Sequence, residues 1–402
     1  MQNQKSKTFS ALPLFYVYAL FFMWGFVWNL FNVLAAFFQE TFQLSNTETS
    51  LGTSLSFLAF FLISYPAKII INKLGTQKAI SLGAVIVAIG LLVFIPASYF
   101  KNYAIFLVGL FVLFSGITIL QTVCNPYIGV LGSEKNRAAR INFAQGIGAI
   151  GAALTAPLGG WFILQLFDDN IFGGIKLFYL IIAGLFFILA ILVKLVKMPH
   201  NPTDVKNKEE KIQDKKGAFK YPHFVIGFII MFIYMGAEAI LYQLMTPYFK
   251  EIGGINSTEA VKFSAFIFYG LMLGRLLGAW IMTKIKPSIT LGVSTLIAAL
   301  LVIASMLIGG KTGIYLITGI GLFISIVFAS IFSLATTDLG KYTNQASSFL
   351  IMGISGGFFL PLLFGVVADN FSLRTSLFVV IIPLLLTSLY GFTFKFLLKN
   401  NN

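Results

Sequence analysis

Long apolar runs separated by short polar stretches extend along the whole chain. Each run contains about 20 residues or more, the length that an α-helix needs to cross the hydrocarbon core of a bilayer. The pattern therefore predicts an all-α integral membrane protein with twelve transmembrane helices. These helices are expected near residues 11–39, 48–72, 78–99, 102–132, 139–166, 175–197, 222–249, 258–284, 288–308, 313–337, 344–368 and 373–397.

The longest polar interruption follows the sixth predicted helix and is rich in lysine and acidic residues. We interpret it as a solvated linker. It divides the chain into an N-terminal six-helix bundle (1–198), a cytoplasmic linker (199–221) and a C-terminal six-helix bundle (222–402). Residues 125–160 and 333–365 share a Leu-Gly helix end, a charged loop, a glycine cluster and a Pro-Leu pair. This similarity indicates two pseudo-symmetric halves, although glycine and proline are common in membrane bundles generally.

Composition and charge support a membrane protein. Of the 402 residues, 58% are hydrophobic and only 10% are charged, whereas soluble domains have about 25% charged residues. With both termini placed in the cytoplasm, 21 of the 28 Lys and Arg residues fall on inner segments. This follows the positive-inside rule. The distribution accounts for the net charge of +14, so we expect the lipid bilayer rather than nucleic acid as the macromolecular environment.

Glu238 is the one acidic residue within an otherwise uncharged apolar run, residues 224–249. A charged group near the centre of a bilayer costs about 2.5–3.5 kcal/mol on insertion scales, and it is a functional-site hypothesis by default. Tyr234 and Tyr242 lie four residues to either side, on the same helix face. A carboxylate between two aromatic rings is typical of a sugar site. The alternative is a structural ion pair between Glu238 and Arg275 of the eighth predicted helix.

Amide side chains occur in three predicted helices of the first half, at intervals that place them on shared faces. Amides offer both donors and acceptors, which suits sugar hydroxyl groups. The alternative is interhelical hydrogen bonding, worth about 0.6 kcal/mol on average. Converging amides from three helices favour a hydrated binding site. The candidates are Asn29 and Asn32, then Gln121 and Asn125, then Asn142 and Gln145.

Signatures of enzymes and ATP-driven pumps are missing. The two histidines, His200 and His223, lie in or beside the central linker, and no phosphate-binding loop or nucleophile elbow occurs. The single cysteine excludes an internal disulfide and a cysteine-only metal site. We therefore expect neither catalysis nor a bound metal or cofactor.

Several segments resemble the fucose–galactose–glucose–proton symporter family of the major facilitator superfamily. They are FFMWGFVWNLFNVL, FSGITILQTVCNPYIGVLG, RINFAQGIGAIGA, YMGAEAILYQLMTPYF, GLMLGRLLGAW and SSFLIMGISGGFFLPLLFG. The resemblance extends over nearly the whole chain. It implies the major facilitator fold, a monomer in the bacterial inner membrane, and transport of a monosaccharide such as glucose, galactose, mannose or fucose by alternating access.

The chain also departs from this family pattern. The resemblance to the fucose symporter would place carboxylates at Asn32 and Gln121, where this chain has amides that cannot carry a proton. Glu238 is then the candidate proton carrier, in a position where the fucose pattern has glutamine. Four alternatives stay open: coupling to a proton through Glu238 or to sodium, uniport without an ion, export of another small solute, and a non-transporting sugar sensor.

The loop between the second and third predicted helices departs from the superfamily pattern as well. Lys68, Lys73 and Lys78 keep its basic character, but Asn72 replaces its expected acidic residue. The resemblance therefore implies that the charged latch of this loop is weak or is built differently.

Overall fold

The structure is a computed structural model of the chain. It describes residues 11–28, 30, 38, 41–44, 46–196, 198, 217–243, 245–255 and 257–399. Within these residues, 11 helices are long and apolar enough to cross a membrane, and a shorter apolar helix, Leu12–Trp28, precedes them. Together they account for all twelve predicted spans, so the all-α membrane fold is confirmed.

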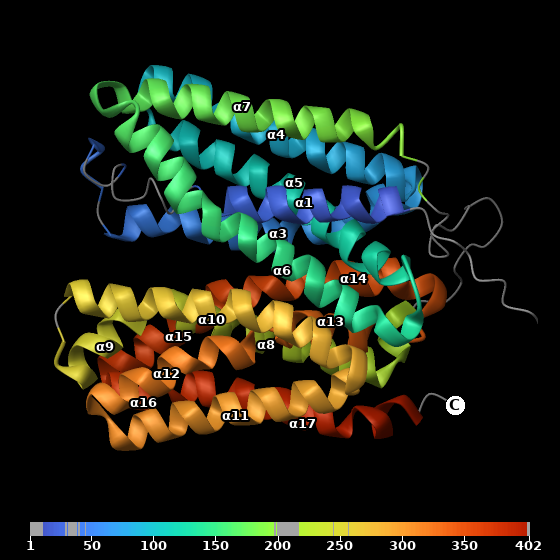
Figure 1. The fold of residues 1–402 in the computed structure, drawn as a ribbon, viewed down its shortest axis with the longest axis vertical. Helices are drawn as coiled ribbons and strands as arrows, with labels where there is room; N and C mark the ends of the chain where they lie inside the picture. Colours follow the sequence, from blue (N-terminus) through green and yellow to red (C-terminus); the bar gives the residue numbers. More distant parts are fainter. Residues whose placement is uncertain are drawn as a thin grey trace, which may run out of the picture.

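The helices before the central linker form one group, the first bundle, in the upper part of Figure 1. Two of them begin at asparagine caps. The Asn102 side chain accepts a hydrogen bond from the Ile105 amide, and Asn170 accepts one from the Gly173 amide. The bundle consists of α1 (Ala11–Trp28), α3 (Asn46–Leu74), α4 (Thr76–Phe100), α5 (Tyr103–Val130), α6 (Arg137–Thr155) with a π-helical continuation (Ala156–Gln165), and α7 (Ile171–Leu192).

The helices after the linker form the second bundle, in the lower part of Figure 1. It consists of α8 (Pro222–Gln243), α9 (Met245–Gly253), α10 (Ser257–Lys284), α11 (Pro287–Ile308), α12 (Gly310–Ile324), α13 (Val327–Ala335), α14 (Thr343–Met352), α15 (Gly356–Asn370), α16 (Leu373–Ser376) and α17 (Phe378–Lys399). Short 3₁₀ segments occur at Glu134–Asn136, Asp168–Asn170, Gly217–Lys220, Gly340–Tyr342 and Gly353–Ser355.

The tenth predicted span is broken into two helices, α12 and α13, between Ile324 and Val327. Ser325 contributes to the break because its hydroxyl donates to the Leu322 carbonyl at 2.7 Å, and such back-bonding often bends helices. Helix α10 packs against the same place through Gly274, where a Cβ atom would lie 2.4 Å from the Leu322 carbonyl oxygen. The break matters because its carbonyl groups become available to side chains from other helices.

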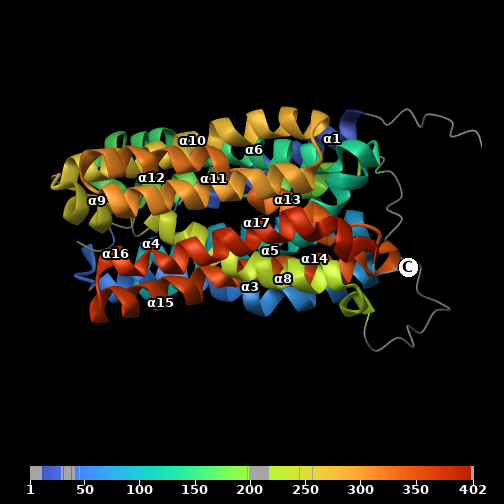
Figure 2. The same cartoon turned by 90° about the horizontal axis from the view of Figure 1, so that it is seen from below.

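The two bundles meet through several pairs of helices. Helix α6 of the first bundle lies against α10 and α13 of the second, and α3 lies against α14. Figure 1 shows the two bundles side by side, and in both Figure 1 and Figure 2 the helices run in nearly the same direction. The helices that bear the candidate residues, α5, α6, α8 and α10, therefore lie at or next to the contact between the bundles.

Side-chain hydrogen bonds also join the bundles at one end, which we call the linker end. This end contains Gly217–Lys220 and the C-terminal end of α17 (Figure 1, right). Arg137 donates to the Thr336 hydroxyl at 2.7 Å and to its carbonyl at 3.3 Å. The Asn344 amide donates to Asn72 at 3.3 Å. In this structure Asn72 therefore takes part in a neutral, amide-to-amide contact between the bundles.

Candidate functional site

The amides of α5 form a buried row that is held by the helix itself. Gln121 and Asn125 are one turn apart, and both side chains are buried. The Asn125 Nδ2 atom donates to the Gln121 carbonyl at 2.9 Å. This bond leaves Asn125 Oδ1 directed to a neighbouring helix, where it accepts a hydrogen bond from Gln145 Nε2 at 3.1 Å. Three of the predicted residues therefore form one connected group across α5 and α6.

Asn142, three residues before Gln145 on α6, makes a hydrogen bond to the second bundle. Its Nδ2 atom donates to the Arg275 carbonyl of α10 at 2.6 Å. Its Oδ1 atom is buried and has no hydrogen-bond partner in the part of the chain that the structure describes. A buried acceptor without a partner costs about 1–3 kcal/mol. Such an atom is suited to accept a hydrogen bond from a ligand hydroxyl group.

Arg275 spans the contact between α6 and α10. Its Nη1 atom donates to the Gln145 carbonyl at 3.3 Å, and its Nε atom donates to the Ser325 carbonyl at 3.4 Å. The second acceptor is available because the break between α12 and α13 exposes it. The bond to Gln145 and the bond from Asn142 to the Arg275 carbonyl join the two bundles in opposite directions, whereas the bond to Ser325 holds the guanidinium group within the second bundle.

The ion pair between Glu238 and Arg275, the alternative to a sugar-binding role for Glu238, is not formed in this structure. Among the described residues, the one salt bridge joins Arg137 to Glu134. Arg275 lies within electrostatic range of the Glu238 carboxyl group, but its donors go to backbone carbonyls instead. The physical reason is the broken helix, which offers the guanidinium group a carbonyl acceptor close to α10.

Glu238 itself is buried, with 4% of its surface exposed. Its carboxyl group accepts a hydrogen bond from the Tyr242 hydroxyl, one turn along α8. The ring of Tyr242 packs against Phe268 of α10, with 5.0 Å between the ring centroids. Tyr234, on the other side of Glu238, is fully buried, and its hydroxyl donates to the Ile324 carbonyl at 2.9 Å. Of the two predicted aromatic partners, Tyr242 is therefore the one bonded to the carboxyl group.

Two predicted residues, Asn29 and Asn32, lie outside the described residues. Trp28, the last residue of α1, packs its ring against Phe60 and Phe114, with centroid distances of 5.4 and 5.2 Å. Sequence reasoning missed the part that Arg275 plays in connecting α6 and α10. The available signal was a single arginine within the apolar segment LMLGRLLGAW.

This geometry defines a class of protein. Two helical bundles enclose buried amides on one side of their contact and a buried carboxyl group on the other, an arrangement typical of secondary transporters. Residues 17–359 match the model of the Major Facilitator Superfamily. The chain belongs to this superfamily.

Individual relatives agree with this assignment. The chain is 33% identical over 380 residues to the glucose/galactose transporter of Brucella abortus biovar 1 (strain 9-941), covering 92% of this chain and 91% of that protein. It is 29% identical over 382 residues to the L-fucose-proton symporter of Escherichia coli (strain K12), covering 89% and 87%. The resemblance identified from sequence segments is therefore confirmed.

Solved structures share the fold. The transporter FucP, in the outward conformation, matches with a TM-score of 0.85 and 28% identity over 96% of this chain and 98% of that chain. The proton:xylose symporter XylE matches with a TM-score of 0.78 at 14% identity. These matches confirm the predicted major facilitator fold.

Proposed function

We propose that this protein is a secondary transporter that carries a monosaccharide across the membrane by alternating access. One observation carries the proposal most directly: on the same helix as Gln145, which is bonded to Asn125, Asn142 has a buried acceptor, Oδ1, without a hydrogen-bond partner among the described residues. A sugar presents hydroxyl donors around its ring and would supply the missing partner. The names of the relatives, which include glucose/galactose transporters and L-fucose-proton symporters, support the same substrate class.

The sugar site in this proposal is shared between the bundles. Gln121, Asn125 and Gln145 supply amide donors and acceptors from the first bundle, and Glu238 and Tyr242 supply a carboxyl group and a ring from the second. Bringing both sets onto one ligand requires the bundles to close around it. Release requires them to separate again, and this is the movement that alternating access needs.

Binding of hexoses by the purified protein tests the substrate class. Gln121→Ala and Glu238→Ala should abolish saturable binding while the variants stay folded. A matched control is Glu251→Ala, because Glu251 is exposed on α9 and lies outside the site. If no sugar in a broad panel, amino sugars included, stabilises the protein or competes for uptake, the substrate assignment is wrong.

Proton coupling through Glu238 is the first of two transport models. It rests on the burial of Glu238 and on the absence of other acidic residues from its apolar run. In proteoliposomes, addition of sugar should make the outside medium more alkaline, and Glu238→Gln should abolish this signal. Sugar movement with neither proton nor sodium movement would overturn this model.

Uniport is the second model, and the amides at positions 32 and 121 favour it because neither side chain can release a proton in the physiological range. It predicts sugar exchange that is independent of imposed proton and sodium gradients. Saturable binding without any flux would instead indicate a sensor built on the same scaffold. Radiolabelled hexose uptake, measured with and without each gradient, distinguishes the three outcomes.

The orientation that we propose places the linker end in the cytoplasm of a bacterium, with both termini inside and the protein in the inner membrane as a monomer. The excess of lysine and arginine on the segments at that end supports this orientation. Cysteines introduced at Lys286 and at Lys311 test it. A membrane-impermeant thiol reagent added to intact cells should label the variant at position 311 and leave the one at 286 unlabelled.

A further inference from the structure

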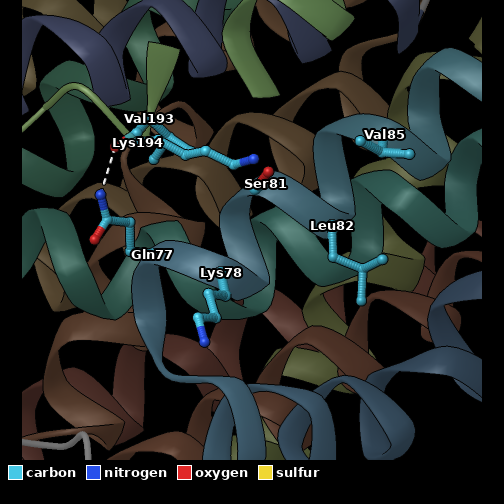
Figure 3. A pocket seen from close by; sticks show the side chains of 7 residues that line it. All are labelled: Gln77, Lys78, Ser81, Leu82, Val85, Val193 and Lys194. Atoms are coloured by element: carbon cyan, nitrogen blue, oxygen red, sulfur yellow. Dashed lines mark hydrogen bonds between the residues drawn. The ribbon is translucent and has the colours of Figure 1, made fainter. Parts of the chain in front are cut away.

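A groove of about 470 Å³ lies on the outer side of the first bundle, between the beginning of α4 and the end of α7 (Figure 3). None of the candidate sugar-binding residues lines it. The lining residues are Gln77, Lys78, Ser81, Leu82, Val85, Val193 and Lys194.

Hydrogen bonds between the two helices hold the groove in shape. Helix α7 ends at Leu192, and the last carbonyls of a helix lack partners within it. Gln77 donates to the Val193 carbonyl at 2.6 Å (Figure 3), and Ser81 donates to the Ala190 carbonyl at 2.8 Å. Because α4 side chains supply the bonds, the two helices keep a fixed separation and the groove is preformed.

The rim of the groove is basic. Figure 3 shows Lys78 and Lys194 flanking the first turns of α4, and both residues are exposed. No acidic residue lines the groove. Neither lysine belongs to a salt bridge among the described residues. The rim therefore presents two positive charges without compensation from the lining.

The wall beneath the rim is apolar, and its side chains are half-buried. Leu82 and Val85 follow Lys78 along one face of α4, so the apolar wall extends about 10 Å from the charged rim at 1.5 Å per residue. Around Lys194, the side chains of Ile191 and Leu195 are 61% and 73% exposed. Exposed aliphatic side chains of this kind indicate contact with lipid tails, so Lys194 lies where the bilayer meets water.

We propose that this groove binds an anionic phospholipid. The phosphate of the headgroup lies at the rim of the groove, within reach of the long side chains of Lys194 and Lys78, and an acyl chain runs along Leu82 and Val85. Basic pockets between transmembrane helices at the cytoplasmic side are suited to such headgroups. The aliphatic stems of the lysines pack along the lipid while their ammonium groups reach the phosphate. The groove thus combines the two chemistries of a phospholipid, a negative head and an apolar tail.

The test uses the purified full-length protein in a neutral detergent, titrated with phosphatidylglycerol or phosphatidylcholine and followed by native mass spectrometry and thermal melting. Phosphatidylglycerol should bind and raise the melting temperature, whereas phosphatidylcholine should not. Replacing both lysines (Lys78→Gln with Lys194→Gln) should weaken phosphatidylglycerol binding about 30-fold, as expected from two lysine contacts at a membrane surface.

Two further variants separate the site from general charge effects. The pair Lys284→Gln with Lys286→Gln removes the same charge at the linker end of the second bundle and should leave binding unchanged. Leu82→Trp fills the apolar wall without a change of charge and should also weaken binding. Three results would each overturn the proposal. The protein could bind both lipids equally, the Lys78/Lys194 variant could bind phosphatidylglycerol as tightly as the unmodified protein does, or inorganic phosphate could displace the lipid at equal concentration.

Discussion

The two ends of the Asn142 amide group are bonded differently at the contact between the bundles. The Nδ2 atom bonds the Arg275 carbonyl of the second bundle. The Oδ1 atom is buried without a partner in the described structure. A purely structural asparagine at a helix contact would be expected to satisfy both ends. The open acceptor is therefore the feature that separates a binding residue from a packing residue.

This difference can be tested with Asn142→Ala. The variant loses one interhelical hydrogen bond, so the free energy of unfolding should fall by about 1 kcal/mol. It also loses the acceptor that we propose for a sugar hydroxyl group, so the dissociation constant of the sugar should rise about fivefold, the equivalent of one further hydrogen bond. Thermal melting and equilibrium sugar binding measure the two effects.

Thr155→Val is the matched control, because Thr155 lies on the same helix but is not one of the candidate site residues. Its hydroxyl group donates to the Phe26 carbonyl at 2.6 Å. It should lower stability and leave affinity unchanged. If Asn142→Ala behaves in the same way, Asn142 serves packing alone.

The second prediction at the residue scale concerns the hydroxyl group of Tyr242. It is bonded to the buried carboxyl group of Glu238, and Tyr242→Phe removes it with almost no change of shape. The free energy of unfolding should fall by about 1–3 kcal/mol because a buried acceptor loses its partner. Sugar affinity should fall as well, since the carboxyl group is no longer held in place.

Urea or detergent denaturation and sugar binding would measure the effects of Tyr242→Phe. Tyr269→Phe on α10 is the control, because Tyr269 is 54% exposed and such changes usually stay within about 0.5 kcal/mol. Unchanged affinity in Tyr242→Phe would show that the hydroxyl group does not orient Glu238 for the sugar.

At the scale of helices, the site depends on the close approach of α10 to the break between α12 and α13. Gly274 permits this approach, since a Cβ atom there would lie 2.3 Å from Ser325 Oγ. Gly274→Ala should force the helices apart and lower the free energy of unfolding by about 1–3 kcal/mol through overpacking. It should also displace the Ser325 carbonyl from Arg275 and slow transport.

The control for this prediction is Gly319→Ala on α12, where a Cβ atom would meet nothing within 4 Å. Alanine favours a helix over glycine by about 1 kcal/mol, so this variant should be unchanged or slightly more stable. The melting temperatures of the Gly274→Ala and Gly319→Ala variants measure this difference in stability. Equal stability would contradict the proposed close approach.

Particular elements show how far the sequence could predict this structure. The spans were predictable because each apolar run is long enough to cross a bilayer, and the polar faces of α5, α6 and α8 were predictable from helical spacing. The break at Ser325 was not, because it lies within a continuous apolar run without proline. Since Arg275 bonds a carbonyl at that break, its partner could not be predicted either, and the alternative pairing with Glu238 rested on charge alone.

At the scale of the whole molecule, the structure has the bundles joined at the linker end. Arg137 bonds Thr336, and Asn72 bonds Asn344. Both contacts connect the first bundle to the second. Neither is an ion pair, in contrast to the charged latch that the family resemblance implies for the loop containing Asn72. The contact between Asn72 and Asn344 is neutral, and such a contact costs less to open than a buried charge pair. This suits a joint that must break in every transport cycle.

Alternating access requires this joint to open, and a reversible cross-link tests whether it does. In a Cys124→Ser background, Asn72→Cys with Asn344→Cys places two thiols where the amides now meet. A short bifunctional thiosulfonate reagent should reduce sugar uptake to background, because the bundles can no longer separate at the linker end, and reductant should restore it. Ala218→Cys with Gln345→Cys is the control. The Ala218 amide donates to Gln345 Oε1 at 3.0 Å, and neither residue belongs to the first bundle. Full uptake by the cross-linked 72/344 pair would mean that the bundles do not move apart here.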